Sequence, residues 1–223
     1  MLDTLSIVKT PTAARKLFGA ALWKVKTKEK VLYLTFDDGP IEEVTPTILD
    51  HLKQHDAKAT FFCIGKNITA QPLLYERIIA EGHSIGNHTQ QHLNGWYTEN
   101  LQYYESIEQC GKVMRHSANG HVQMLDEQQA TFFRPPYGKL TITQYNHLKN
   151  KYKIVMWDVL TFDFDLTISK EQVLSNVLKN TTAGSIIVFH DSLKAKEKVL
   201  YTLPKVLEYY TQLGYRFERL IHS

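Results

Sequence analysis

The chain has 223 residues, of which 43% are hydrophobic and 22% charged, a size and composition that favour one globular α/β domain with a sizeable core. Its 26 basic and 23 acidic residues leave a formal net charge of +3, too balanced to predict a nucleic-acid partner. No uninterrupted apolar run approaches the roughly 18 residues of a transmembrane helix.

We expect residues 1–29 to lead into a single domain over 30–223 without forming a domain of their own. They contain no apolar core of about 7 to 15 residues followed by a small-residue cleavage site, so no signal peptide is visible and a cytoplasmic location is the default expectation. The two cysteines, Cys63 and Cys110, are far apart and in no CxxC pattern, as expected of ordinary reduced thiols.

Short apolar runs rich in β-formers mark the expected strands, in chain order at 31–36, 59–64, 83–87, 130–134, 153–159, 185–189 and 215–221. Most of them lack alternation, which is typical of parallel strands covered on both faces. Helical patterns lie between them, at 45–56, 71–81, 98–115, 141–151, 169–180 and 198–213. The first begins with Thr45 as the expected N-cap and Pro46 at the first helical position.

Alternating strands and helices with short connections predict parallel βαβ units. Ionisable side chains gather where the expected strands end: Asp37, Asp38, His88, Arg134, Asp158, Asp163, His190 and Asp191. In a barrel of parallel strands these ends converge on the face where active sites are built. The pattern therefore predicts an active site there.

Two adjacent carboxylates, Asp37 and Asp38, leave the first expected strand just before Gly39 and Pro40. Successive strand side chains point to opposite faces, so both acids reach one site only if the backbone twists locally. Two ionised acids held close together raise the pKa of one of them unless a cation intervenes. Simple turn chemistry remains an equal alternative for this motif alone.

The histidines His88 and His92 follow the third expected strand at i, i+4 spacing. If that segment is helical or coiled, both imidazoles lie on one side and can hold a transition metal. Two histidines and one aspartate form a three-ligand site with open positions, as in catalytic Zn²⁺ centres, and leave the other aspartate as a general base. The same ligands also suit Fe(II) in a non-haem oxygenase.

The segment FFRPPYG places a rigid loop after the fourth expected strand. Pro135 and Pro136 lack backbone N–H groups, so the first amide donor after Arg134 is that of Tyr137, which could stabilise an oxyanion. Arg134 could orient a carboxylate through its planar guanidinium. At the end of the sixth strand, His190 could protonate a leaving group. A stiff surface loop and a core histidine are the structural alternatives.

Five elements in this order, TFDDGP, HTQQH, RPPYG, WDVLTFDF and IIVFHD, resemble the polysaccharide deacetylases with a NodB homology domain, carbohydrate esterase family 4. The likeness covers about residues 30 to 218. It implies a distorted (β/α)7 barrel, in agreement with the seven expected strands. It also implies that the domain at 30–223 is a polysaccharide deacetylase domain.

The resemblance also implies a role for each matching residue. Asp37 resembles the catalytic base, and Asp38, His88 and His92 resemble the ligands of Zn²⁺ or a similar divalent ion. Arg134 resembles the residue that orients the base, Asp163 the acid that contacts this arginine, and His190 the general acid. We assign substrate binding to the Tyr137 backbone N–H and to Pro135, Phe164 and Trp96.

Two positions depart from the family pattern: Phe164 stands where tryptophan is common, and Leu160 where aspartate is frequent. Phe164 offers an apolar surface without an indole N–H, while Trp96 and Tyr97 could provide a stacking platform or simply pack. The expected activity is metal-dependent removal of acetyl groups from N-acetylated amino sugars in a glycan. The alternatives are an O-acetyl esterase, a catalytically weak carbohydrate-binding protein and an iron oxygenase.

Overall fold

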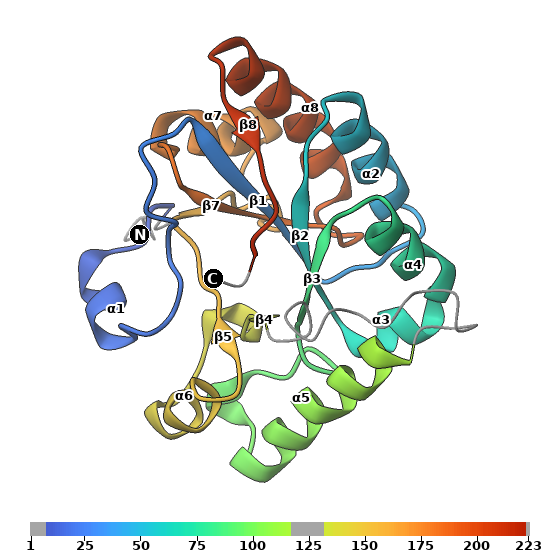
Figure 1. The fold of residues 1–223 in the computed structure, drawn as a ribbon, viewed down its shortest axis with the longest axis vertical. Helices are drawn as coiled ribbons and strands as arrows, with labels where there is room; N and C mark the ends of the chain where they lie inside the picture. The colour runs from blue at the N-terminus through green and yellow to red at the C-terminus, as the bar shows by residue number, and fades with distance from the viewer. Residues whose placement is uncertain (1–7, 117–131, 222–223) are drawn as a thin grey trace.

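A curled parallel sheet organises the computed structural model, which describes residues 8–116 and 132–221 (Figure 1). The strand order is β5-β4-β3-β2-β1-β7-β6, and β8 pairs with β1. The strands are β1 Val31–Asp37, β2 Ala59–Cys63, β3 Ser84–Asn87, β4 Phe132–Phe133, β5 Lys153–Ile154, β6 Val159–Leu160, β7 Ile186–His190 and β8 Arg216–Phe217. The predicted distorted α/β barrel is therefore confirmed.

Helices surround the strands (Figure 1). They are α1 Thr12–Leu17, α2 Thr45–Gln54, α3 Gly65–Ala70, α4 Pro72–Ala80, α5 Asn100–Arg115, α6 Ile142–Leu148, α7 Lys170–Asn180 and α8 Lys196–Gln212, with short 3₁₀ turns η1 Gly95–Tyr97 and η3 Pro136–Gly138. All six expected helices are present, and α1 and α3 are additional. Among the described residues, no helix has the length and apolarity needed to cross a bilayer.

The expected strand at 153–159 is wrong, because the chain there forms two short strands that pair with opposite edges of the sheet. The carbonyls of Val155 and Met156 accept hydrogen bonds from the Arg134 guanidinium at 3.2 and 2.9 Å, which takes them out of a strand ladder. Residues 155–158 thus carry the chain from one sheet edge to the other. This short link requires the sheet to curl until its edges meet.

The N-terminal residues 8–25 run along this seam between the sheet edges. Leu22 bridges Val155, and Lys9 bridges Val159. Arg15 forms an ion pair with the buried Asp158 carboxylate, which also accepts a hydrogen bond from Ser185. This described part of the segment therefore packs onto the barrel; residues 1–7, like residues 130 and 131 of the fourth expected strand, lie outside the described residues.

Side chains of β1 alternate between the two faces of the sheet and thereby aim one carboxylate into the barrel. Leu34 and Phe36 belong to the apolar layer beneath the outer helices, where the Phe36 ring stacks on Phe61 at 4.9 Å. Thr35 and Asp37 point the other way and both bind Arg134. The period of two in this strand therefore places Asp37 inside the barrel mouth.

The expected N-cap at Thr45 is wrong, since α2 begins at Thr45 and the N-cap residue is Val44, which has no side-chain capping bond. The Thr45 hydroxyl donates to the buried Asp191 carboxylate at 2.7 Å instead, and it accepts from the Ile41 N–H. The Thr45 hydroxyl is thus held by a contact with a distant part of the chain, which a local sequence pattern does not predict.

The two cysteines, Cys63 and Cys110, are free and buried.

Candidate active site

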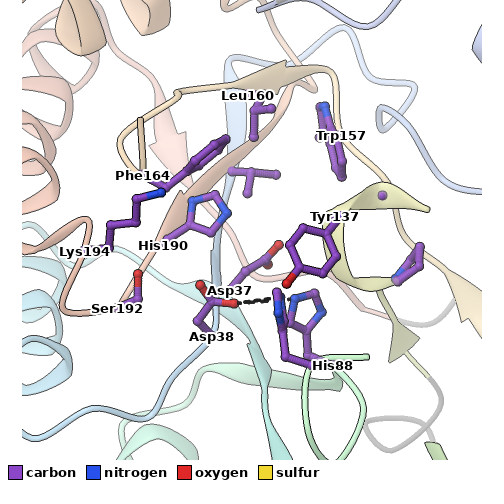
Figure 2. Close-up of a pocket in the computed structure, with 14 residues that line it drawn as sticks. Asp37, Asp38, His88, Tyr137, Trp157, Leu160, Phe164, His190, Ser192 and Lys194 are labelled. Carbon is purple, nitrogen blue, oxygen red and sulfur yellow. Dashed lines mark ion pairs between the residues drawn. The ribbon is translucent and has the colours of Figure 1, made fainter. Parts of the chain in front are cut away.

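The Asp37–Asp38 pair converges because the backbone changes direction between the two residues. Asp37 is the last residue of β1, and Asp38 adopts a left-handed conformation with φ 86°. This is the local twist that the sequence required for both carboxylates to face one site. Both residues line a cavity of about 500 Å³ at the barrel mouth (Figure 2).

Asp38, His88 and His92 bring one ligand atom each to within 4.8 Å of one another. The Asp38 Oδ1 lies 3.7 Å from the Nε2 of His88 and 3.2 Å from that of His92. The residues around His92 form a loop, although their i, i+4 spacing is also compatible with a helix. Thr89 and His92 have φ values of 64° and 58°, and these two left-handed turns bring the imidazoles together.

The chemistry of these three groups fits a divalent metal ion. Asp38 Oδ1 is buried and accepts no hydrogen bond from the part of the chain that the structure describes. Nδ1 of His88 is 2.8 Å from the Arg134 carbonyl, which makes it the N–H donor and leaves Nε2 as a lone-pair donor. Burial lowers the pKa of His88 to about 4, so the imidazole is neutral at neutral pH. Although burial opposes ionisation, the nearby imidazoles of His92, His190 and His88 together lower the pKa of Asp38.

Arg134 holds Asp37 in place from beneath the cavity. Its guanidinium is fully buried, stacks 4.1 Å from the Phe62 ring centre and donates to Asp37 Oδ1 at 2.6 Å. The predicted contact between Arg134 and Asp37 is thus present. Because the remaining donors are used by Thr35 and two main-chain carbonyls, the planar group has a single fixed orientation.

The predicted contact between Asp163 and Arg134 is wrong, since the structure places Asp163 on His190. Asp163 Oδ1 is 2.7 Å from His190 Nδ1, and Oδ2 accepts the His190 backbone N–H at 2.8 Å. Four of the five guanidinium N–H donors of Arg134 bind Asp37, Thr35 and two main-chain carbonyls, whereas the loop after β6 carries Asp163 to the end of β7. Burial alone would lower the pKa of His190, but the charge and hydrogen bond of Asp163 raise it to about 9.

The cavity has two walls above the metal-ligand floor (Figure 2). One wall carries Phe164, His190, Ser192 and Lys194; the other carries Tyr137, Gly138 and Trp157. Of the predicted site residues, Asp37, Asp38, His88, His92, Pro135, Tyr137, Phe164 and His190 line the cavity, as does the divergent Leu160. The sequence reasoning gave no site role to Trp157, Ser192 and Lys194, which stand near motifs four and five.

The loop after Arg134 presents the Tyr137 backbone at the cavity edge. Tyr137 has φ 60°, and its ring centre lies 4.6 Å from that of His92. No described residue accepts a hydrogen bond from the Tyr137 N–H, so this donor is available to a ligand. Gly138 at φ 66° fits beneath Trp157, where a Cβ would lie 2.4 Å from the indole ring. The indole therefore supports the turn that carries this amide.

Trp96 lies outside the cavity lining. Its ring is 57% exposed, its Nε1–H donates to the Leu140 carbonyl, and Lys139 Nζ lies 4.9 Å from the ring centre. The neighbouring Tyr97 is 82% exposed. A role for Trp96 in substrate binding stays a prediction, restricted by this position to sugar units outside the cavity.

Replacing Gly39 by alanine is expected to disrupt the turn that aims Asp38. Asp191 Oδ1 accepts the Gly39 N–H at 2.8 Å, and an added Cβ would lie 1.8 Å from Asp191 Oδ2. We expect the free energy of unfolding to fall by about 1–3 kcal/mol, together with weaker metal binding. Urea unfolding measures the free energy of unfolding, and Gly19→Ala, at an exposed glycine, is the control. An unchanged unfolding midpoint in Gly39→Ala would show that the turn tolerates the methyl group.

Comparison with known proteins identifies the family. The polysaccharide deacetylase family profile matches residues 24–153. A peptidoglycan-N-acetylglucosamine deacetylase of Bacillus cereus is 31% identical over 89% of this chain and 90% of its own length. A chitooligosaccharide deacetylase of Azorhizobium caulinodans is 32% identical over 80% of this chain and 81% of its own length.

A solved structure is similar over nearly the whole chain. The Bc1960 peptidoglycan N-acetylglucosamine deacetylase, crystallised with 4-naphthalen-1-yl-N-oxidanyl-benzamide, superposes with a TM-score of 0.83. It shares 33% identity, and the match covers 95% of each chain. Sequence profile, relatives and fold agree, and all five motifs that carry the resemblance supply residues to the cavity or its support. The chain therefore belongs to the polysaccharide deacetylases of carbohydrate esterase family 4, hydrolases that remove acetyl groups from glycans.

Proposed function

We propose that this protein hydrolyses the N-acetyl group of an amino sugar, with N-acetylglucosamine in a peptidoglycan- or chitin-like glycan as the substrate. One observation carries the proposal. Asp37 and His190 both line the cavity that contains the Asp38–His88–His92 triad, so a base, an acid and a metal-ligand set face the same volume (Figure 2). Metal-assisted amide hydrolysis uses each of these three components.

Asp38, His88 and His92 would hold a divalent ion, for which we propose Zn²⁺. When bound, it would supply Lewis acidity toward the acetyl carbonyl and lower the pKa of water. Asp37 removes the proton from the attacking water. Arg134 donates a hydrogen bond to Asp37 Oδ1 at 2.6 Å and thereby keeps this carboxylate oriented for the proton transfer. Two of the three predicted ligands are histidines, which bind a metal as neutral imidazoles, so a bound divalent ion would keep net positive charge beside Asp37.

Two further groups act on the acetyl and amine ends of the substrate. The Tyr137 N–H, which has no partner among the described residues, donates to the oxyanion that forms at the carbonyl oxygen when water attacks the carbonyl carbon. His190 protonates the departing amine, and Asp163 keeps the imidazole protonated and oriented. An amine leaves poorly without a proton, whereas an ester oxygen is a better leaving group. A protonated His190 therefore favours N-deacetylation over O-deacetylation.

The pH profile of activity is expected to depend on Asp163. Because Asp163 raises the pKa of His190 to about 9, activity should decline only above about pH 9. Asp163→Asn removes the charge, lowers this pKa and shifts the alkaline decline to lower pH. The dependence of kcat on pH measures this shift. Asp165→Asn is the control and should leave the alkaline decline at its wild-type pH. An unmoved alkaline limb in Asp163→Asn would exclude His190 as the titrating acid.

The same pair makes a pH-dependent contribution to folding. His190 has its pKa raised from 6.5 to about 9 in the folded state, so the stabilisation is fully present below pH 6.5. It is lost as the pH rises through about 9. Chemical unfolding of wild type and Asp163→Asn at pH 6 and pH 10 measures this difference.

Acetate release from three substrates tests the proposal: chitin oligosaccharides, peptidoglycan fragments and O-acetylated xylan, each with and without Zn²⁺ or Co²⁺. We expect release from one or both N-acetylated substrates and little from xylan. Preferential release from xylan would identify an O-acetyl esterase. Saccharide binding without release, with metal bound, would identify a carbohydrate-binding protein; oxygen-dependent turnover with iron would identify an oxygenase, in which the acid and base have no evident task.

A further inference from the structure

One cavity residue has no task in the chemistry proposed above. Among the described residues that line the cavity, Lys194 is the only lysine or arginine. Within the described chain it forms no ion pair of 4.0 Å or less, and its Nζ lies 5.8 Å from the Phe164 ring centre. Asp165, whose pKa is lowered mainly by hydrogen bonds from Thr167 and in part by the Lys194 charge, forms no ion pair with Lys194 in the described chain. Lys194 thus brings a positive charge that has no salt-bridge partner among the described residues to the rim of a mainly apolar cavity.

The position of Lys194 relative to His190 indicates what this charge faces. The Phe164 ring meets His190 edge-on at 4.9 Å and has the Lys194 Nζ 5.8 Å from its centre, so the three side chains lie together on one wall (Figure 2). Ser192 lines the same wall between His190 and Lys194 in sequence. If His190 protonates the departing amine, the sugar that carries this amine lies against this wall. A neighbouring sugar would then extend across Phe164 toward Lys194.

We propose that Lys194, assisted by the Ser192 hydroxyl, binds a carboxylate on the sugar unit adjacent to the one that is deacetylated. This inference rests on the proposed function and deepens it, because it selects the substrate class. A glycan whose alternate sugars carry a free lactyl carboxylate, as in peptidoglycan strands from which the peptides have been removed, satisfies Lys194. A neutral chitin-like chain leaves its charge unpaired. An ammonium at a partly exposed rim discriminates modestly, by about fivefold.

The test compares three tetrasaccharides. One is a peptide-free peptidoglycan tetrasaccharide, whose lactyl groups carry carboxylates; the second is the same molecule with these groups converted to methyl esters; the third is chitotetraose. The variants are Lys194→Met, which keeps the apolar stem, and Lys194→Arg, which keeps the charge. Lys196→Met is the matched control, since Lys196 is exposed at the start of α8 and lies outside the cavity lining.

We expect Lys194→Met to lower kcat/KM for the acidic tetrasaccharide about fivefold and to leave the other two substrates unchanged. The loss should appear in KM, shrink as salt concentration rises, and be largely restored in Lys194→Arg, because the contact is an exposed charge pair. Lys196→Met should match wild type on all three. An equal loss on acidic and esterified substrates, or no loss, would overturn the carboxylate assignment.

Binding measurements separate this inference from the proposed reaction. Calorimetric titration gives the Kd of each tetrasaccharide for wild type and Lys194→Met, whether or not acetate is released. If wild type releases no acetate but prefers the acidic tetrasaccharide in a Lys194-dependent way, the hydrolase proposal fails and the carboxylate site stands. If acetate is released but Lys194→Met keeps the wild-type preference for the acidic tetrasaccharide, the carboxylate site fails and the hydrolase proposal stands.

Discussion

Asp37→Asn is expected to lower kcat for N-acetyl hydrolysis by about 10²- to 10⁴-fold, the range for loss of a general base. The amide is nearly isosteric with the carboxylate but cannot accept the proton from water. Metal content should stay at the wild-type level, because Asp38, His88 and His92 supply the predicted ligands. Steady-state acetate release and metal analysis of the same preparation measure both quantities.

Asp37→Asn should also lower the free energy of unfolding, and this effect has to be separated from the effect on kcat. Arg134 is fully buried, and its ion pair with Asp37 at 2.6 Å offsets that burial. Removing one partner of a buried pair typically costs about 3–5 kcal/mol. Assays are therefore made well below the unfolding midpoint, with Asp50→Asn, an exposed acid on α2, as the control. A folded, metal-loaded Asp37→Asn enzyme with near wild-type kcat would rule out Asp37 as the base.

Removal of the metal is expected to abolish activity, and one equivalent of Zn²⁺ per chain is expected to restore it. Without the ion, the two histidines and Asp38 offer no Lewis acid to the acetyl carbonyl. His92→Ala should weaken metal binding by more than the roughly 100-fold that loss of an outer-shell partner costs. Competition with a chromogenic chelator measures the affinity.

The control is His51→Ala, which removes a histidine from α2, away from the cavity. It should bind metal like the wild type. Full activity of the chelated enzyme, or metal affinity in His92→Ala equal to that of His51→Ala, would contradict the proposed centre.

Much of the site could be predicted because the motifs follow the ends of successive parallel strands. Asp37 ends β1, His88 follows β3 and His190 ends β7, and parallel strands bring these ends to one face of the barrel. The pairing of a base, three metal ligands and an acid then followed from residue chemistry and from the family resemblance.

What could not be predicted depends on contacts between distant segments or on unusual backbone angles. His88 and His92 meet through left-handed turns at Thr89 and His92, which no helical or strand periodicity encodes. Asp163 reaches His190 rather than Arg134 because the loop after β6 ends beside the end of β7, a tertiary contact that no local pattern encodes. The break of the expected strand at 153–159 has the same origin.

Lys194 and Trp157 were missed for a related reason. Each stands near a motif, but a lysine in a loop and a tryptophan after a strand usually indicate solvated surface and packing. Only the fold shows that both side chains line the cavity. The substrate-facing walls are thus formed by motif residues such as Phe164 and His190 together with residues that have no predicted role, such as Lys194.

The most direct test of the account is mass analysis of a chitin or peptidoglycan oligosaccharide treated with metal-free enzyme to which Zn²⁺ is added stepwise. The account predicts that each turnover converts one acetamide to a free amine with release of one acetate, at a rate that rises linearly with Zn²⁺ and saturates at one ion per chain. Loss of acetyl groups at the same rate without metal, or unchanged oligosaccharides with one ion bound per chain, would contradict it.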